Sequence, residues 1–302
     1  MKTCSSIELR NLASIAVLVR SVQHATPSRT ALRVAMRRAA HQLYDARPLV
    51  FEDPIAVPIL GDTYAEEVRR TPQRPDRPWS VGLRAFMVAR SRYAEDNLAR
   101  AVAGGVAQYV LLGAGLDTFA HRNPFAGLHV FEVDHPATQA WKRELLSAGH
   151  IPLAGAHSYV PVDFETQTLA AQLAGAGFDA RRPAFFSWLG VVPYLTREAF
   201  RATIRFVGAM PAGSGVVLDY SQPRHVLPPL EQLGFDSLAS RVQLAGEPFR
   251  LFFTPEEIAG ELRGFSGIED LGTQEMNARY FARRADSLRL IGSAGRMLAA
   301  WR

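Results

Sequence analysis

The chain reads Gln-Tyr-Val-Leu-Leu-Gly-Ala-Gly-Leu-Asp-Thr over residues 108–118, and the main indication of its architecture lies in this segment. An apolar run from Tyr109 to Leu112 stops at Gly113, and a second glycine follows at Gly115. A short continuous apolar run is typical of a strand that is buried on both faces of a parallel sheet. Two glycines directly after such a strand permit a tight turn and let a ligand touch bare backbone. The segment therefore predicts a central strand that ends in a ligand-binding turn.

Further short apolar runs follow this strand along the chain. They cover residues 129–133, 158–162, 184–189 and 215–220, with two weaker strands expected at 266–271 and 288–291. Helical stretches fit between the strong runs at 136–148, 166–176 and 197–210. Strands that alternate with helices of about 10–15 residues predict a parallel sheet covered on both faces. We therefore expect an α/β fold with a doubly wound, Rossmann-like sheet.

The residues before this sheet have a different pattern. Apolar residues at helical spacing predict helices over 29–47 and 81–103, with a proline-rich loop at 69–78 between them. The expected organisation is therefore an N-terminal helical portion over 1–104 that acts as a cap, followed by a binding core over 105–302. Within this core, a stretch near 221–254 contains four prolines and little periodicity, which favours an inserted lid.

Composition places the chain among ordinary globular proteins. Of its 302 residues, 48% are apolar and 21% are charged, which excludes a disordered chain, a fibre or a small disulfide-stapled protein. The single cysteine, Cys4, can form neither an intramolecular disulfide nor a thiolate metal cluster, and a reducing, cytoplasmic setting fits this. The eight histidines show no metal-ligand spacing, so we expect no metal site.

The net charge of +5 raises the question of a nucleic-acid partner. The basic residues are nearly all arginines, scattered among 29 acidic residues without a long basic run, so nucleic-acid binding is not expected. No segment approaches the roughly 18 apolar residues that a membrane span requires, so no membrane partner is expected either. The apolar stretch from Leu12 to Val19 favours an N-terminal helix over a signal peptide.

The turn after the first strand also indicates which kind of ligand it binds. The dinucleotide-binding motif Gly-x-Gly-x-x-Gly requires a third glycine at position 118, but this chain has Thr118 there, preceded by Asp117. A pyrophosphate needs a helix N-terminus without a nearby anion. Asp117 therefore argues against a dinucleotide and a nicotinamide oxidoreductase, and it suits a ligand with a positive charge such as an amino group.

Acidic residues also end the two neighbouring strands. Asp134 lies 19 positions after Gly115, and an acid about 20 residues past the glycines can accept hydrogen bonds from a ribose hydroxyl. Asp163 ends the third strand, where it can meet an adenine amino group while Phe164 packs on the ring. Either aspartate could instead cap a helix. An adenosine ligand that lacks a pyrophosphate but carries an ammonium group is S-adenosylmethionine, which we expect across the three strand ends.

A set of short motifs extends over about residues 29–290. These motifs are Thr30-Ala31-Leu32, Arg38-Ala39, Phe51-Glu52-Asp53-Pro54-Ile55-Ala56, Ala89-Arg90-Ser91-Arg92, Leu112-Gly113-Ala114-Gly115-Leu116-Asp117-Thr118, Phe131-Glu132-Val133-Asp134-His135-Pro136, Pro161-Val162-Asp163-Phe164, Tyr194-Leu195, Gly246-Glu247-Pro248-Phe249 and Arg279-Tyr280-Phe281-Ala282-Arg283-Arg284-Ala285-Asp286. Through them the chain resembles the leucine carboxyl methyltransferase family, including its bacterial branch, which is similar to tetracenomycin-type polyketide carboxyl methyltransferases. The resemblance implies a class I methyltransferase that uses S-adenosylmethionine.

The resemblance also implies roles for individual residues. The cofactor-binding residues are then Gly113, Ala114 and Gly115 for the methionine part, Asp134 for the ribose, and Asp163 and Phe164 for the adenine. Arg90 matches a family arginine that neutralises the cofactor carboxylate, a two-oxygen partner that suits a planar guanidinium. On the residues alone, Arg90 could also be a surface arginine on the helix over 81–103.

One position departs from the family pattern. Members that methylate protein C-termini carry an acid on the fourth strand just before a glycine, where this chain has Leu189 before Gly190. This favours O-methylation of a small-molecule acceptor. Protein C-terminal carboxyl methylation, nucleic-acid methylation and a catalytically silent cofactor-binding protein are the alternatives.

The choice of acceptor decides whether a general base is needed. A carboxylate is already ionised at pH 7 and needs only to be positioned, whereas a hydroxyl would usually want a base. His121 and His135 are candidates by location alone, so we assign no catalytic residue. Tyr194 and Tyr220, at or just past the ends of the fourth and fifth strands, either line the acceptor pocket or pack in the core.

Overall fold

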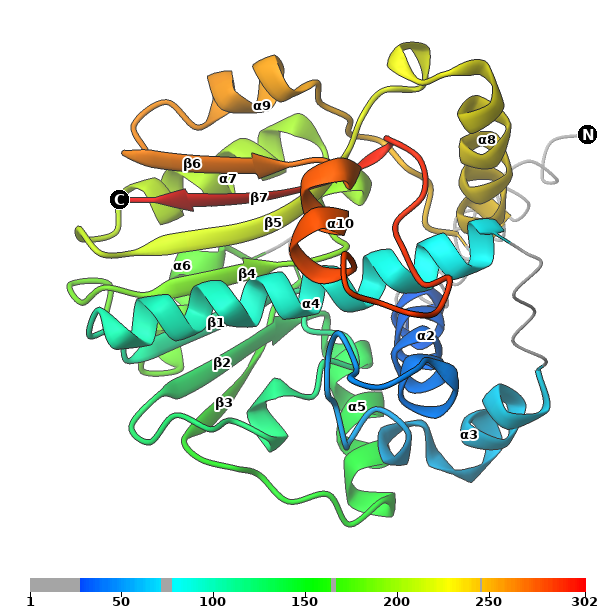
Figure 1. Ribbon diagram of the computed structural model, residues 1–302. Coiled ribbons are helices and arrows are strands. Elements are labelled where there is room, and N and C mark those ends of the chain that lie inside the picture. The colour runs from blue at the N-terminus through cyan, green and yellow to red at the C-terminus, as the bar shows by residue number, and fades with distance from the viewer. Residues whose placement is uncertain (1–27, 72–77, 164–166, 245) are drawn as a thin grey trace, which may run out of the picture.

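The computed structural model describes residues 28–71, 78–163, 167–244 and 246–302 (Figure 1). Its strands are β1 (Gln108–Leu112), β2 (His129–Asp134), β3 (His157–Pro161), β4 (Phe185–Trp188), β5 (Gly215–Ser221), β6 (Gly267–Leu271) and β7 (Gly295–Trp301). Within these residues they form one sheet in the order β3-β2-β1-β4-β5-β7-β6, in which β1 to β5 are parallel and β7 is antiparallel to both its neighbours. The expected α/β class and doubly wound sheet are confirmed. The strand order reverses between β1 and β4, which is where such sheets bind ligands.

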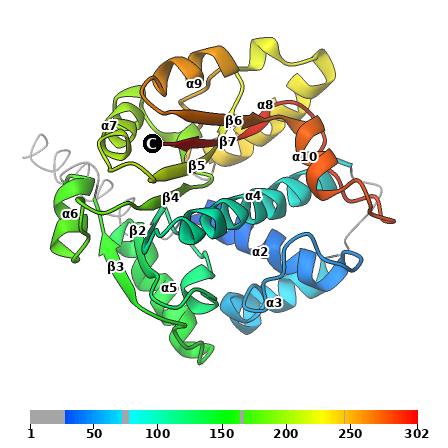
Figure 2. The same cartoon turned by 60° about the vertical axis from the view of Figure 1, so that its left-hand side comes forward.

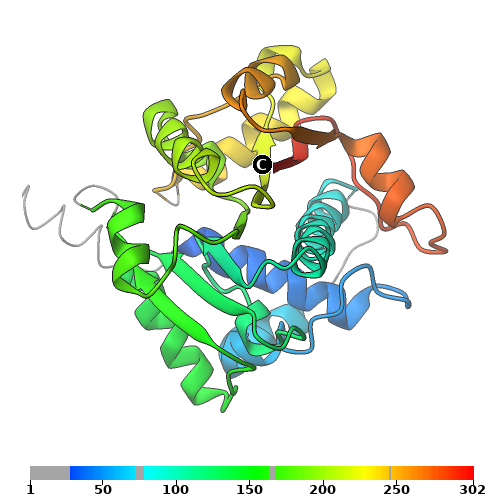
Figure 3. The ribbon, with the colours of Figure 1, turned by 90° about the vertical axis from the view of Figure 1, so that its left-hand side faces the viewer.

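Helices cover both faces of this sheet. The helices of the described residues are α2 (Arg29–Tyr44), η1 (Pro58–Leu60), α3 (Gly61–Arg70), α4 (Pro78–Ala103), η2 (Phe119–His121), α5 (Pro136–Ala148), α6 (Leu169–Gly175), η3 (Val192–Tyr194), α7 (Arg197–Gly208), η4 (Arg224–Val226), α8 (Pro229–Leu244), α9 (Pro255–Glu261) and α10 (Thr273–Tyr280). Figure 2 shows α6, α7 and α9 on one side of the sheet and α4, α5 and α10 on the other. Figure 3 looks along the strands from the amino ends of β1 to β5 and shows the same layers edge-on.

The alternation of side chains along β1 explains its continuous apolar run. Tyr109 and Leu111 pack with α4, whereas Val110 and Leu112 pack on the opposite face with residues of α6 and α7. Successive side chains of a strand point to opposite faces, so a strand covered on both faces needs apolar residues at every position. The helix α4 therefore packs directly on the sheet, although it lies before the expected boundary at 104.

A third, smaller cluster of apolar side chains lies under the N-terminal helices. It joins α2, η1 and α3 to α5 and to Leu116 in the loop after β1. In Figure 1, α2, α3 and α8 lie on the right, beyond the carboxyl ends of the parallel strands. These helices therefore surround the sheet edge at which a ligand is expected.

Several sequence-based expectations need correction. The strand expected at 288–291 is wrong: Leu288 and Leu290 are buried, but the last strand is β7. The loop expected at 69–78 begins later, because α3 continues to Arg70, and residues 72–77 lie outside the described part of the chain. The stretch from Leu12 to Val19 also lies outside it. Among the described helices, none is long and apolar enough to cross a bilayer.

Candidate functional site

The turn after β1 is built from two glycines with a left-handed backbone. The φ angle is +69° at Gly113 and +49° at Gly115, a region that other residues rarely adopt. A Cβ on Gly113 would lie 2.4 Å from Cγ2 of Val191, too close for any real side chain. The N–H groups of Gly113 and Ala114 both donate to the carbonyl of Val133 on β2, at 2.8 and 3.0 Å. The turn is therefore fixed against the end of β2 and presents backbone.

Asp134 ends β2 and holds this turn. Its Oδ2 accepts a hydrogen bond from the N–H of Gly115, and its Oδ1 accepts one from the N–H of His135 at 2.6 Å. Burial raises the pKa of the Asp134 carboxyl, against the lowering effect of these two donors. The N-cap of α5 is His135, whose Nδ1 accepts the N–H of Ala137, so Asp134 is not the residue that caps this helix.

A buried ion pair lies on the α4 side of the sheet. Nη1 of Arg90 on α4 donates to Oδ2 of Asp219 on β5 at 3.2 Å, and each side chain is 7% exposed. Oδ1 of Asp219 accepts the N–H of Gly190, which follows β4. Gly190 has a φ of +70°, and a Cβ there would lie 2.8 Å from Nη1 of Arg90. Arg90 is therefore not a surface residue: a helix, a strand and a turn together position its guanidinium.

Tyr194 connects this ion pair to segment 221–254. It lies half-buried in η3, and burial raises the pKa of its phenol to about 12, a rise to which the carboxylates of Glu247 and Asp219 add. Its ring centroid lies 5.3 Å from that of Phe249. The structure thus brings Tyr194 together with Asp219 and segment 221–254.

Glu247 joins segment 221–254 to the start of α2. Its Oε1 accepts a hydrogen bond from the hydroxyl of Ser28 at 2.8 Å, and its Oε2 accepts bonds from the N–H and the hydroxyl of Thr30. A Cβ on Gly115 would lie 3.1 Å from Cβ of Ala31, the next residue of α2. Segment 221–254 therefore contacts α2, and α2 in turn contacts the glycine turn.

Two of the expected site residues follow β3. Pro161 pairs in register with Asp134, so Asp163 lies just past the end of the strand next to β2, as expected. The N–H of Asp163 donates to Oε1 of Gln167 at 3.0 Å. Phe164 lies outside the described residues.

Tyr220 lies in the core and not among these residues. It is 1% exposed, packs on the α7 side of the sheet, and its hydroxyl donates to Asp270 at 2.6 Å. The interpretation of Tyr220 as a residue of the acceptor pocket is therefore corrected in favour of core packing. Because neighbouring residues of a strand face opposite ways, Asp219 has the position at the site that Tyr220 was expected to take.

Comparison with known proteins identifies the family. A family model described as leucine carboxyl methyltransferase matches residues 31–208, more than half of the chain. The chain belongs to the leucine carboxyl methyltransferase family. A Bacillus subtilis protein named "Putative S-adenosyl-L-methionine-dependent methyltransferase YktD" is 32% identical over 287 residues, which cover 86% of this chain and 93% of that protein. The expected methyltransferase class and the expected cofactor are confirmed.

Solved structures support the fold of this family member. A DUF574 family protein from Streptomyces avermitilis superimposes with a TM-score of 0.52 at 19% identity, covering 88% of this chain and 96% of that one. A protein from Thermobifida fusca, described as "a putative methyltransferase", gives a TM-score of 0.51 at 18% identity, with 92% of this chain and 96% of that one covered. At these identities the likeness concerns the fold alone.

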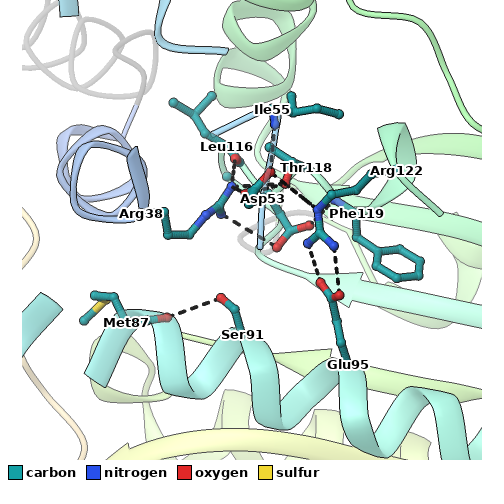
Figure 4. Close-up of polar contacts among 12 residues, drawn as sticks. Arg38, Asp53, Ile55, Met87, Ser91, Glu95, Leu116, Thr118, Phe119 and Arg122 are labelled. Carbon is teal, nitrogen blue, oxygen red and sulfur yellow. Dashed lines mark hydrogen bonds and ion pairs between the residues drawn. The ribbon is translucent and has the colours of Figure 1, made fainter. Parts of the chain in front are cut away.

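In this leucine carboxyl methyltransferase family member, Asp117 faces the N-terminal helices. Its Oδ1 accepts the N–H of Phe119 at 2.7 Å, and its Oδ2 lies 3.9 Å from Nη1 of Arg38 on α2. Figure 4 shows the ion pairs and hydrogen bonds that surround Arg38. The negative charge of Asp117 is therefore already close to a positive charge of the chain itself, that of Arg38.

The two histidines considered as bases both have structural partners. His121 is 7% exposed, and its Nδ1 lies 2.9 Å from the carbonyl oxygen of Pro152, where the ring is the donor. Burial lowers the pKa of His121, which favours the neutral ring. His135 caps α5, as described above.

Sequence reasoning missed Asp219 and gave Glu247 no role. Strand alternation could have placed Asp219 and Tyr220 on opposite faces of β5, but it does not show which of the two faces meets the site. Glu247 lay within a family motif, but only the folded chain brings it to Thr30, 217 positions away.

Proposed function

We propose that this protein is an O-methyltransferase that methylates a carboxylate of a small-molecule metabolite. The observation that carries the proposal is a convergence at the carboxyl edge of the sheet. There the glycine turn, Asp134 and the pair of Arg90 with Asp219 lie beside Tyr194, with segment 221–254 joined to α2 next to them. We further propose that the N-terminal helices and this segment form the cover over the acceptor.

The chemistry of these residues fits S-adenosylmethionine. The turn offers unhindered backbone for the methionine part, and the carboxylate of Asp134 keeps lone pairs for ribose hydroxyls beyond its two N–H donors. A guanidinium has five N–H donors, and Asp219 takes one from Arg90, so the others would hold the cofactor carboxylate. When bound, the cofactor supplies the electrophilic methyl group. The chain contributes position and the exclusion of water.

A carboxylate acceptor agrees best with the groups at the site. Because its pKa is raised to about 12, the phenol of Tyr194 stays protonated at neutral pH and can donate a hydrogen bond to the acceptor, but it cannot act as a base. His121 and His135 are engaged elsewhere. A carboxylate needs no proton removed. Leu189, where members that methylate protein C-termini have an acid, supports a small acceptor.

Cofactor binding tests the site. Calorimetry with S-adenosylmethionine should show that Asp134→Ala weakens binding by about a hundredfold or more, because a charged acceptor of ribose hydroxyls is lost. The control is Glu198→Ala, which removes an exposed carboxylate from α7 and should leave the affinity unchanged. Micromolar affinity retained in Asp134→Ala would remove the ribose assignment.

The type of acceptor is tested by the product. The purified protein is incubated with labelled cofactor and a set of carboxylic acids, and the products are analysed by mass spectrometry before and after mild alkali. A methyl ester is hydrolysed by alkali and a methyl ether is not. Label that survives alkali would show hydroxyl methylation and contradict the carboxylate proposal.

A further inference from the structure

The helix α8 exposes three leucines along one side. Leu230, Leu233 and Leu244 are 70%, 66% and 86% exposed, more than any other large apolar side chain of the described residues. Residues three, four, seven and eleven positions apart lie on the same side of a helix, so the leucines share one face of α8. This face, which we call the outer stripe, consists of the exposed residues Leu230, Leu233, Ser237, Ser240, Arg241 and Leu244. Single exposed leucines are ordinary, but several on one helix face mark an interaction surface.

The opposite face of α8 accounts for its packing on the rest of the protein. Val242 is buried there, and Phe235, seven positions earlier, lies on the same face. The ring centroid of Phe235 lies 6.2 Å from that of Phe249 and 5.6 Å from that of Phe252, and Phe249 in turn contacts Tyr194. The inner face of α8 therefore reaches the candidate site, and the outer stripe is not needed for this packing.

Two exposed arginines lie beside the leucines. Arg241 belongs to the outer stripe, and Arg33 is exposed on α2. Both are close enough to Arg37 on α2 to help lower its pKa, so α2 and α8 carry positive charge in the same region. Among the described residues, neither Arg33 nor Arg241 forms an ion pair with a carboxylate. Their charges therefore face the solvent next to apolar surface.

The two acidic residues of α8 do not offset this charge. Oδ1 of Asp236 accepts a hydrogen bond from Nε of Arg224 at 2.7 Å, in an exposed ion pair without net charge. Oε2 of Glu231 accepts bonds from the N–H and the hydroxyl of Ser293, at 2.6 and 2.7 Å. The surface around the outer stripe is therefore both apolar and positively charged.

Trp79, near the start of α4, borders the same helix. Trp79 is 45% exposed, and a Cβ on Gly234 of α8 would lie 3.5 Å from its ring. Tryptophan favours the interface between membrane and water, because its ring is apolar and its N–H is polar. In Figure 1, α8 lies at the right-hand margin of the molecule, away from the sheet. Apolar side chains, cations and a tryptophan thus lie together at the periphery of the protein.

We propose that the outer stripe of α8 docks the protein on an anionic lipid surface. Such a surface offers negative headgroups to the arginines and an apolar interior to the leucines, whereas a second copy of the chain would bring like charges together. Docking would hold the candidate site, which the inner face of α8 reaches, at the lipid surface. The inference goes beyond the proposed function and does not depend on it. The leucines are separated in the sequence and meet only on the folded helix, so the length of apolar runs does not reveal this face.

Sedimentation with vesicles tests the proposal on the full-length protein. The wild type should bind vesicles of equal parts phosphatidylcholine and phosphatidylglycerol, and should bind vesicles of phosphatidylcholine alone much more weakly. Added salt should weaken the binding, because it screens the charges. The double variant Leu230→Ser with Leu233→Ser should bind the anionic vesicles roughly tenfold to a hundredfold more weakly, since apolar side chains that enter the lipid are lost. Arg241→Gln should weaken this binding roughly fivefold.

Two matched controls lie away from α8. Leu153→Ser, at a leucine that is 51% exposed before β3, and Arg205→Gln, at an exposed arginine on α7, should leave vesicle binding unchanged. The affinity for S-adenosylmethionine should be the same in the double variant and the wild type, which shows that the fold is intact. No binding of the wild type to anionic vesicles, or equal binding by the double variant, would overturn the proposal. Loss of cofactor binding in the wild type would contradict the proposed function only.

Two further measurements distinguish lipid from other occupants of the outer stripe. Leu233→Cys, separated from Cys4 by the mass of the labelled peptide, should react quickly with a polar maleimide, and anionic vesicles should slow this reaction. Slow reaction without vesicles would mean that the chain itself covers the outer stripe, and would overturn the proposal. A dimer in solution that Leu230→Ser with Leu233→Ser dissociates would mean that a second copy covers it, and would overturn the proposal as well.

Discussion

Arg37 and Arg38 are adjacent on α2, yet they differ in burial and in hydrogen-bond partners. Successive residues of a helix point about 100° apart, so the two side chains leave α2 on different faces. Arg38 is 4% exposed and donates to Asp53, to the carbonyl of Leu116 and to Thr118, at 3.0, 3.2 and 3.3 Å (Figure 4). Arg37 is only half-buried, and its Nε has no hydrogen-bond partner among the described residues. The contrast indicates that a fully buried cation has its counter-ion inside the chain, whereas a half-buried cation can leave its charge to the solvent.

The network around Arg38 fixes the loop after the glycine turn. Thr118 donates to Asp53 at 2.8 Å, and Nε of Arg122 donates to Thr118 at 3.1 Å. Arg122 also pairs with Glu95 on α4 through both of its terminal nitrogens. Two cations thus share Asp53, and the network ties α2, α4 and the loop together (Figure 4).

The largest effect is expected from removing the shared carboxylate. Asp53→Ala leaves Arg38 and Arg122 without their common partner and should lower the free energy of unfolding by about 3–5 kcal/mol, measured in urea. The control is Glu52→Ala, whose side chain is 72% exposed and faces Arg47 at 3.8 Å, and which should cost less than about 1 kcal/mol. Similar losses in the two variants would show that a carboxylate buried between two arginines contributes no more to stability than an exposed one.

Another buried cation, Lys142, extends the comparison to the effect of pH on stability. Its Nζ donates to Oε2 of Glu132 at 2.6 Å, with side chains 1% and 0% exposed. Burial would raise the pKa of Glu132, but Lys142 and His157 hold it at about 2. The folded-state pKa is thus below the ordinary value of 4.5, so the stabilisation is complete above about pH 4.5 and is lost as the pH falls towards 2. The pair should account for a loss of roughly 2–3 kcal/mol in unfolding free energy between pH 5 and pH 2.

The variant Lys142→Met tests this assignment. It leaves Glu132 buried without its cation, so the pKa of Glu132 should rise above its ordinary value. The stability that depends on this group should then fall, rather than rise, with increasing pH. An unchanged acid profile of unfolding in Lys142→Met would show that the pair is not the origin of the effect.

A smaller effect is expected within the Arg38 network. Thr118 is completely buried, and Thr118→Val removes the hydroxyl that links two arginines to Asp53 while keeping the shape of the side chain. We expect a loss of about 1–2 kcal/mol in thermal or urea unfolding. Thr203→Val, which removes only a hydroxyl bond to the carbonyl of Ala199 within α7, should cost less than about 0.5 kcal/mol. Equal costs would mean that the network adds nothing beyond one ordinary hydrogen bond.

The sheet could be predicted from the sequence because burial on both faces makes β1, β2, β4 and β5 apolar at most positions. β7 could not, since Gly295–Trp301 contains no β-branched residue, the type that favours strands. The run at 288–291 is apolar because it is buried, and burial does not by itself determine conformation. The helix α8 was also missed, because of its sixteen residues only Val242 is buried.

The residues of the candidate site that lie directly after a strand could be predicted from the sequence. Gly113, Gly115 and Asp134 lie at strand ends that the pattern locates, and the structure joins them. The different surroundings of Arg37 and Arg38 could not be predicted from the sequence, because the packing of α2 against the rest of the chain determines which of the two side chains meets a carboxylate. The sequence alone also could not tell which of two neighbouring residues, Asp219 or Tyr220, faces the site.

The attachment of Glu247 to the first turn of α2 has a kinetic consequence. Because one carboxylate holds segment 221–254 to Ser28 and Thr30, and Ala31 touches the glycine turn, the segment cannot swing outward without disturbing the turn at which we propose that the cofactor binds. Admission of an acceptor and retention of the methyl donor are then mechanically linked. Such an enzyme would load its two substrates in a compulsory sequence, donor first, and release the demethylated nucleoside last.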